Sequence, residues 1–162
     1  MNIEFGCGET ATKPGYLTCD IRDLPGIDFV CPAWEIENHV SNNTVDNIFS
    51  RHFFEHLTFR QGRVVLEQWL NILKPGGLME MMLPNMSFHI RQWTEGENME
   101  HAKAGFWGWQ RGDFEDVWDV HKSGYTLQTL EEVLNETGYE KVTSLHPPTS
   151  KHLYVRTYKP LG

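Results

Sequence analysis

The hydrophobic and polar positions of the chain follow two periods, one typical of strands and one typical of helices. Ile3 and Phe5 alternate with polar neighbours, as in a short strand that starts almost at the first residue. Later runs with strand character are separated by turn residues such as glycine, proline and asparagine. The predicted strands comprise residues 1–5, 16–20, 27–31, 45–49, 78–83, 140–145 and 153–158.

Two other stretches carry apolar side chains at helical spacing. The first is residues 58–73, which begin at Thr58, a good N-cap, and are followed by the stop signal Lys-Pro-Gly-Gly at 74–77. The second is residues 126–137. The connector at 146–151 is too short for a crossover helix, so we expect the last two strands to pair antiparallel.

The segment from about residue 87 to residue 125 lacks a clear period. It carries four of the six tryptophans, together with several glycines, aspartates and histidines. Such a segment after a strand is typical of a lid or a loop-rich insert. Tryptophans usually pack in cores, but their crowding here favours a cavity wall for Trp107 or Trp109.

Length and composition predict one globular domain, residues 1–162, with 40% hydrophobic residues. The formal charge of −8 disfavours an extended nucleic-acid surface, which needs clustered Lys and Arg. No apolar run reaches the roughly 18 residues needed to span a bilayer, and no signal peptide is recognisable. The spacing of the three cysteines, Cys7, Cys19 and Cys31, is not that of a metal-binding pair. We therefore expect free thiols and a cytoplasmic location.

A glycine turn at the end of the first strand is the first feature that indicates a ligand-binding site. Gly6 and Gly8 have no Cβ, so they permit a sharp turn and the close approach of a ligand. Asp20 ends the second strand. A glycine turn after one strand and an acid at the end of the next indicate the nucleotide-binding half of a Rossmann-like sheet, although a plain tight turn would also need these glycines.

The order of motifs resembles the class I S-adenosylmethionine-dependent methyltransferases, in particular the methyltransferase type 11 group. The residues that carry the resemblance are Ile3-Glu4-Phe5-Gly6-Cys7-Gly8, Asp20, Val45-Asp46-x-Ile48, Phe54-Glu55-His56-Leu57 and Leu73-Lys74-Pro75-Gly76-Gly77. The resemblance implies a three-layer α/β sandwich with a mostly parallel, seven-strand-type sheet and an antiparallel C-terminal hairpin. The short gap between the first two strands implies that the N-terminal helices of the fold are reduced or missing.

The same resemblance implies a binding site for S-adenosylmethionine and its product S-adenosylhomocysteine. Glu4 would order the glycine loop and the methionine end, and Gly6, Cys7 and Gly8 would pass under the cofactor. Asp20 would accept hydrogen bonds from both ribose hydroxyls.

The residues after the third strand would flank the adenine, and here the sequence departs from the family. Pro32 stands where an aspartate often accepts from the adenine amino group. Asp28, a backbone group of Ala33 or the face of Trp34 would then recognise the base. His52, after the fourth strand, would lie near the sulfonium.

Methyl transfer needs alignment, desolvation and, for some acceptors, a base. The candidate bases are His121, His52, Asp119 and His89, because their segments follow strands that end at the expected pocket. Asp119 could set the tautomer of His121. Each of these histidines could equally be a structural residue with one hydrogen bond.

The function predicted from the sequence is therefore methyl transfer from S-adenosylmethionine to a small molecule or a sugar, without a membrane and without a resident metal. One alternative is a catalytically degenerate cofactor-binding or scaffold protein of the same fold. A second is aminopropyl transfer from decarboxylated S-adenosylmethionine, for which no acidic pair is evident. A remote one is a zinc hydrolase, since His52, Glu55 and His56 fit a His-x-x-Glu-His signature if they lie on a helix.

Overall fold

A seven-stranded mixed sheet forms the centre of the protein, seen here in a computed structural model that describes residues 1–8, 11–112 and 118–162. The strand order is β3-β2-β1-β4-β5-β7-β6. The strands are β1 (Asn2–Phe5), β2 (Leu17–Asp20), β3 (Phe29–Val30), β4 (Val45–Arg51), β5 (Leu73–Pro84), β6 (Glu140–Ser144) and β7 (His152–Tyr158).

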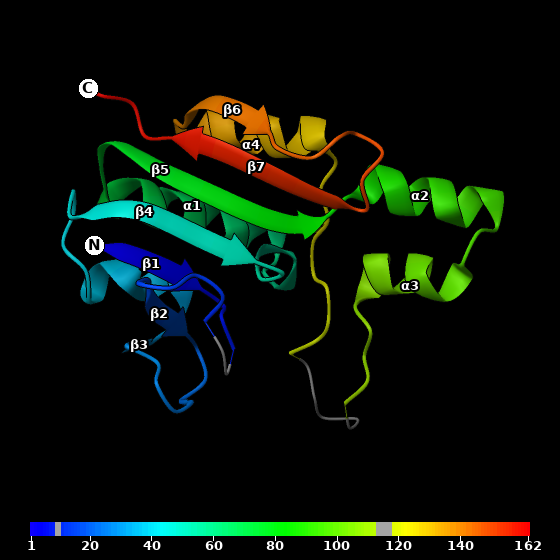
Figure 1. The fold of residues 1–162 in the computed structure, drawn as a ribbon, viewed down its shortest axis with the longest axis horizontal. Coiled ribbons are helices and arrows are strands. Elements are labelled where there is room, and N and C mark those ends of the chain that lie inside the picture. Colours follow the sequence, from blue (N-terminus) through cyan, green and yellow to red (C-terminus); the bar gives the residue numbers. More distant parts are fainter. Residues whose placement is uncertain (9–10, 113–117) are drawn as a thin grey trace.

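The first five strands are parallel, and β7 is antiparallel to both β5 and β6. This confirms the predicted α/β fold, with its mostly parallel sheet and its antiparallel C-terminal hairpin. Crossovers on both sides of β1 bring the carboxyl ends of β1, β2 and β4 together at one edge of the sheet (Figure 1). A ligand site is expected at such an edge in open α/β sheets.

The two predicted helices form, and each begins at a threonine N-cap. Helix α1 (Phe59–Ile72) begins with a capping box in which Thr58 accepts from the backbone N–H of Gln61 and the Gln61 side chain accepts from the N–H of Thr58. Helix α4 (Leu127–Thr137) begins in the same way at Thr126 and ends at a glycine with positive φ. The shorter 3₁₀ helices are η1 (Ala33–Asn38) and η2 (Phe54–His56).

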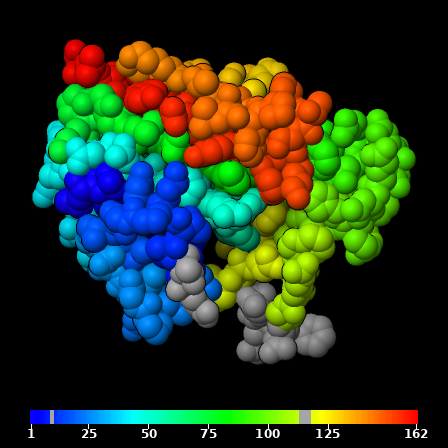
Figure 2. All heavy atoms as spheres, viewed as in Figure 1, coloured from blue at the N-terminus to red at the C-terminus, as the bar shows by residue number. Residues whose placement is uncertain are grey.

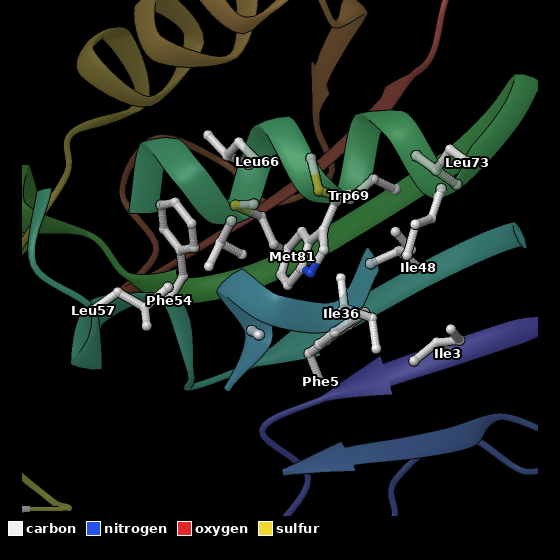
Figure 3. Close-up of a cluster of buried hydrophobic side chains, with 14 of the residues drawn as sticks. Ile3, Phe5, Ile36, Ile48, Phe54, Leu57, Leu66, Trp69, Leu73 and Met81 are labelled. Carbon is white, nitrogen blue, oxygen red and sulfur yellow. The ribbon is translucent and has the colours of Figure 1, made fainter. Parts of the chain in front are cut away.

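The hydrophobic core lies between the sheet and the layer of η1, α1 and α4. Trp69 of α1 is fully buried, and its ring centroid lies 4.7 Å from that of Phe5. Figure 3 shows Trp69 pointing from the helix toward Met81 and the strands beneath it. Burial of large apolar side chains such as these is the main force that holds helix and sheet together.

Among the described residues, no helix covers the opposite face of the sheet, and a loop lies there instead. The Lys13 ammonium lies 4.5 Å from the ring centroid of Phe49 and forms an ion pair with Glu80, which Arg156 also contacts. The backbone of this loop is held by Glu4. Among the described residues between β1 and β2 there is no helix, in agreement with the short gap.

The aperiodic segment contains two helices that the hydrophobic pattern did not reveal, α2 (Met86–Glu95) and α3 (Met99–Trp107). The buried positions of α2 are polar, His89 and Gln92, and those of α3 are small residues. A hydrophobic period therefore does not mark either helix. They project as a helical pair from the carboxyl end of β5 (Figure 1).

Candidate functional site

A cavity of about 410 Å³ lies at the carboxyl ends of β1, β2 and β4. One side, the N-terminal wall, consists of Gly6, residues 19–22 and residues 31–34. The other side, the histidine wall, consists of residues 52–53, residues 56–57, Gln61, Trp118, Asp119 and Lys122. Figure 2 shows the surface hollowed between the blue N-terminal segments and the yellow segment near residue 120.

The glycine turn of the N-terminal wall needs both glycines. Gly6 has φ of +65° and Gly8 has φ of +63°, in the left-handed region that side chains disfavour. A Cβ on Gly6 would lie 2.2 Å from Cδ2 of Phe53, so the Phe53 ring occupies the space that only glycine leaves. The Gly6 N–H donates to the carbonyl of Cys19 at 2.8 Å, which ties the turn to β2.

Glu4 lies behind this turn and is almost fully buried. Its carboxylate accepts from the N–H and hydroxyl of Thr12 and from the N–H of Lys13, at 2.7 to 3.1 Å. Glu4, Cys7 and Gly8 are not among the residues that line the cavity. The contacts of Glu4 favour the predicted role in ordering the loop, and its predicted contact with the cofactor stays a prediction.

Asp20 lines the cavity. It accepts from the N–H of Gly8 at 3.0 Å and from both the backbone and the guanidinium of Arg22. Burial alone would raise the pKa of the Asp20 carboxyl, but the hydrogen bonds from Arg22 and Gly8 lower it below its usual value. Asp20 is therefore an ionised acceptor at neutral pH, as ribose recognition requires.

Residues 31–34 carry the part of the wall that would meet a base. Ala33 and Trp34 line the cavity, as predicted, and Pro32 precedes η1 as its N-cap residue. Asp28 is committed elsewhere, since it accepts from the N–H of Thr18 at 2.8 Å and from its hydroxyl at 2.9 Å. Of the three predicted adenine contacts, Asp28 is thus the one that the structure places in a different network.

His52 projects from the histidine wall at a strained position. Its φ is +49°, immediately after β4. Its Nδ1 lies 3.3 Å from Oε1 of Glu55, and its ring centroid lies 4.8 Å from that of His152. A carboxylate that accepts from Nδ1 leaves Nε2 of a neutral histidine as a proton acceptor.

The other predicted bases occupy different places. Asp119 lines the cavity, whereas His121 lies one layer behind, with its ring centroid 5.0 Å from that of His56. The Nδ1 of His121 lies 3.0 Å from the carbonyl oxygen of Gly105, so this backbone group fixes its tautomer. Burial lowers the pKa of His121. His89 is buried in α2 next to Gln92, and burial lowers its pKa to about 4.

Several residues of the histidine wall were not predicted from the sequence. Trp118 lines the cavity, whereas Trp107 and Trp109 do not, so the prediction of a wall position for one of those two was wrong. Lys122 and His56 also line it. The backbone N–H groups of Lys122 and Ser123 donate to the carbonyl of Glu55, a contact between segments about 65 positions apart that no local pattern reveals.

The helix required by the zinc-hydrolase alternative does not form. His52 follows the end of β4 with positive φ, and η2 begins two residues later at Phe54. His52 and His56 therefore do not lie one turn apart on one helix, which is the arrangement that the signature needs.

The sequence matches the family described as methyltransferase domain over residues 3–144. The chain belongs to this family. The match confirms the predicted resemblance to the methyltransferases. No curated protein matches the sequence.

Solved structures share the fold at low identity. A possible histamine N-methyltransferase from Thermotoga maritima has a TM-score of 0.67 and 13% identity, over 98% of this chain and 81% of that one. A Burkholderia thailandensis N1-methyltransferase, solved with 1,6-didemethyltoxoflavin and S-adenosylhomocysteine, has a TM-score of 0.63 and 12% identity over 98% and 70%. The CurJ carbon methyltransferase has a TM-score of 0.63 and 16% identity over 98% of this chain, which spans about half of that protein (48%).

Within the part of the chain that the structure describes, no helix is long and apolar enough to cross a membrane.

Proposed function

We propose that this protein transfers a methyl group from S-adenosylmethionine to a small-molecule acceptor. The observation that carries the proposal is the N-terminal wall, which combines a glycine turn with an ionised, buried carboxylate at the switch point of a parallel sheet. A cavity of this size suits a small ligand.

The N-terminal wall would hold the cofactor. The ribose hydroxyls would donate to Asp20, in competition with the Arg22 guanidinium, which already contacts both carboxylate oxygens. Trp34 and the backbone of Ala33 would contact the adenine, and the glycine turn would pass beneath the methionine end. The cofactor supplies the electrophilic methyl group, and the protein supplies alignment and a desolvated wall.

The histidine wall would hold the acceptor. His52 is the base that the geometry favours, because it lines the cavity and Glu55 orients its ring. The other predicted bases stay candidates, Asp119 on the wall and His121 behind it. Lys122 and Trp118 give this wall one cation and one apolar face.

The acceptor class is a proposal that rests on size and charge. The relative from Burkholderia thailandensis was solved with a small molecule, and a small metabolite or a sugar would fit the same kind of cavity. The net charge of −8 opposes binding to bulk nucleic acid.

A binding protein without catalysis is the second candidate. Pro32 and the reduced helical cover favour it, since both remove contacts that hold the cofactor in the family. It would bind S-adenosylhomocysteine but transfer no methyl group.

The experiment is a screen of small-molecule acceptors that measures the formation of S-adenosylhomocysteine, followed by the His52→Ala variant. With an accepted substrate whose nucleophile must lose a proton, His52→Ala should reduce turnover at least about 100-fold. His39→Ala, an exposed histidine outside the cavity, is the matched control. Full turnover by His52→Ala would reject His52 as the base, and binding without turnover across the screen would favour the second candidate.

A further inference from the structure

Three potential metal ligands gather at the histidine wall, where His56 lines the cavity and Glu55 and His121 lie behind it. One potential metal-ligand atom from each of Glu55, His56 and His121 lies within 4.8 Å of the others. Glu55 and His56 belong to η2, and His121 comes from the segment that follows α3, about 65 positions later. The fold therefore assembles this cluster from two distant segments.

Both histidines present the same nitrogen to the backbone. Nδ1 of His56 lies 3.1 Å from the carbonyl oxygen of Val120, and Nδ1 of His121 lies 3.0 Å from that of Gly105. A carbonyl only accepts, so in the neutral form of each ring Nδ1 carries the proton and Nε2 carries the lone pair. Metal-binding histidines typically have their other ring nitrogen fixed in this way.

The carboxylate of Glu55 is incompletely satisfied. The residue is 1% exposed, and its Oε1 lies 3.3 Å from Nδ1 of His52. Its Oε2 is buried and has no hydrogen-bond partner among the described residues. A buried carboxylate oxygen without a partner is costly, and a cation would remove that cost.

We propose that Glu55, His56 and His121 bind one divalent transition-metal ion, with zinc as the reference metal. Two histidines and one glutamate are a donor set that zinc takes in catalytic sites, where three protein ligands leave one position open. Metal–ligand distances of about 2.0–2.2 Å would draw the three atoms to about 3.4 Å from one another. Side-chain rotations would have to supply that contraction.

The position of His56 indicates what the open coordination site would do. His56 lines the cavity, so a ligand on the metal would lie next to the acceptor. An acceptor oxygen, nitrogen or sulfur bound there would be held and made easier to deprotonate. This role rests on the proposed function, whereas metal binding itself does not.

The test uses the whole protein, stripped with a chelator and then titrated with Zn²⁺ by calorimetry and with Co²⁺ by visible absorption. The expected result is one equivalent of Zn²⁺ with a dissociation constant below about 1 μM, and a Co²⁺ spectrum of low coordination number. Glu55→Gln and His121→Asn should each weaken Zn²⁺ binding at least tenfold, whereas the exposed His39→Ala should not change it.

Absence of a stoichiometric Zn²⁺ site in the wild type would overturn the proposal, as would equal affinity in Glu55→Gln. Either result would leave Glu55, His56 and His121 as a structural cluster without a metal ion. Circular dichroism checks the fold of each variant, and the wild-type stoichiometry decides even if a variant unfolds. S-adenosylhomocysteine binding, measured on the metal-free protein, separates a failure of this site from a failure of the proposed function.

Discussion

The two walls of the cavity differ in how the chain builds them. The N-terminal wall comes from residues 6–34, a short continuous stretch in which turns follow directly on strands. The histidine wall joins the end of β4 to the segment 118–122, two parts of the chain that meet only in the folded protein. Backbone turns within one stretch of the chain shape the N-terminal wall, whereas contacts between distant segments assemble the histidine wall.

The walls also differ in their charges. Asp20 in the N-terminal wall is an ionised carboxylate whose pKa is lowered by its partners. His152 and His121, which lie against the histidine wall, are neutral because burial lowers the pKa of each. The two walls should therefore respond differently to sequence changes and to pH.

The largest expected effect comes from adding a methyl group at the glycine turn. Gly6→Ala adds the cost of a left-handed alanine, about 1–2 kcal/mol, to a clash with Phe53 worth about 1–3 kcal/mol. We expect the free energy of unfolding to fall by about 2–5 kcal/mol and S-adenosylhomocysteine binding to be lost. Urea unfolding and calorimetry measure these two effects.

Gly26→Ala is the matched control for that change. Gly26 also has positive φ, +84°, but a Cβ there meets nothing within 4 Å. Gly26→Ala should lower the free energy of unfolding only by the cost of a left-handed alanine, and it should leave S-adenosylhomocysteine binding unchanged. An equal decrease in the free energy of unfolding in the two variants would mean that the close approach of Phe53 to Gly6 does not contribute to stability.

Removal of the anion should separate binding from folding. Asp20→Ala loses hydrogen bonds to a charged group, worth about 1.5–3 kcal/mol, so cofactor affinity should fall about 10- to 100-fold. Asp28→Ala breaks a comparable carboxylate network outside the cavity and should reduce stability without changing affinity. An unchanged dissociation constant in Asp20→Ala would contradict the assignment of the ribose site.

Mild acid should lower the stability of the fold through the buried histidines that lie against the histidine wall. Burial, with the nearby charges of His52 and Lys151, lowers the pKa of His152 to about 4, whereas an unfolded histidine has a pKa of about 6.5. Between these values the unfolded chain binds the extra proton, so stability is complete above pH 6.5 and falls toward pH 4. From pH 7 to pH 5, this residue alone should remove about 2 kcal/mol.

Urea unfolding at the two pH values measures that decrease, which should be smaller in His152→Gln. The ionised Asp20 should keep cofactor binding at pH 5 in the fraction that remains folded, because its pKa lies below the usual value. A decrease of the same size in His152→Gln would assign the acid sensitivity to other groups, such as His89.

The difference between the walls also decides what the sequence could predict. The strands, the capped helices α1 and α4, and the placement of Gly6 and Asp20 follow from local patterns of period, cap and turn. Helices α2 and α3 could not be predicted from the hydrophobic pattern, because polar or small residues occupy their buried positions.

The histidine wall could be predicted only in part for a related reason. His52 follows a strand, and its position at the cavity was predicted. The meeting of Glu55 and His56 with His121 depends on backbone contacts across about 65 residues, and no spacing within either segment encodes it.

The most direct test of the account is the binding of S-adenosylhomocysteine to the wild-type protein, measured by calorimetry and by thermal unfolding. We expect one site per chain. We also expect stabilisation of about 2.7 kcal/mol when the ligand is present at 100 times its dissociation constant, which corresponds to a rise in melting temperature of about 5–10 °C. No heat and no rise in melting temperature at millimolar ligand would contradict a cofactor site in the N-terminal wall.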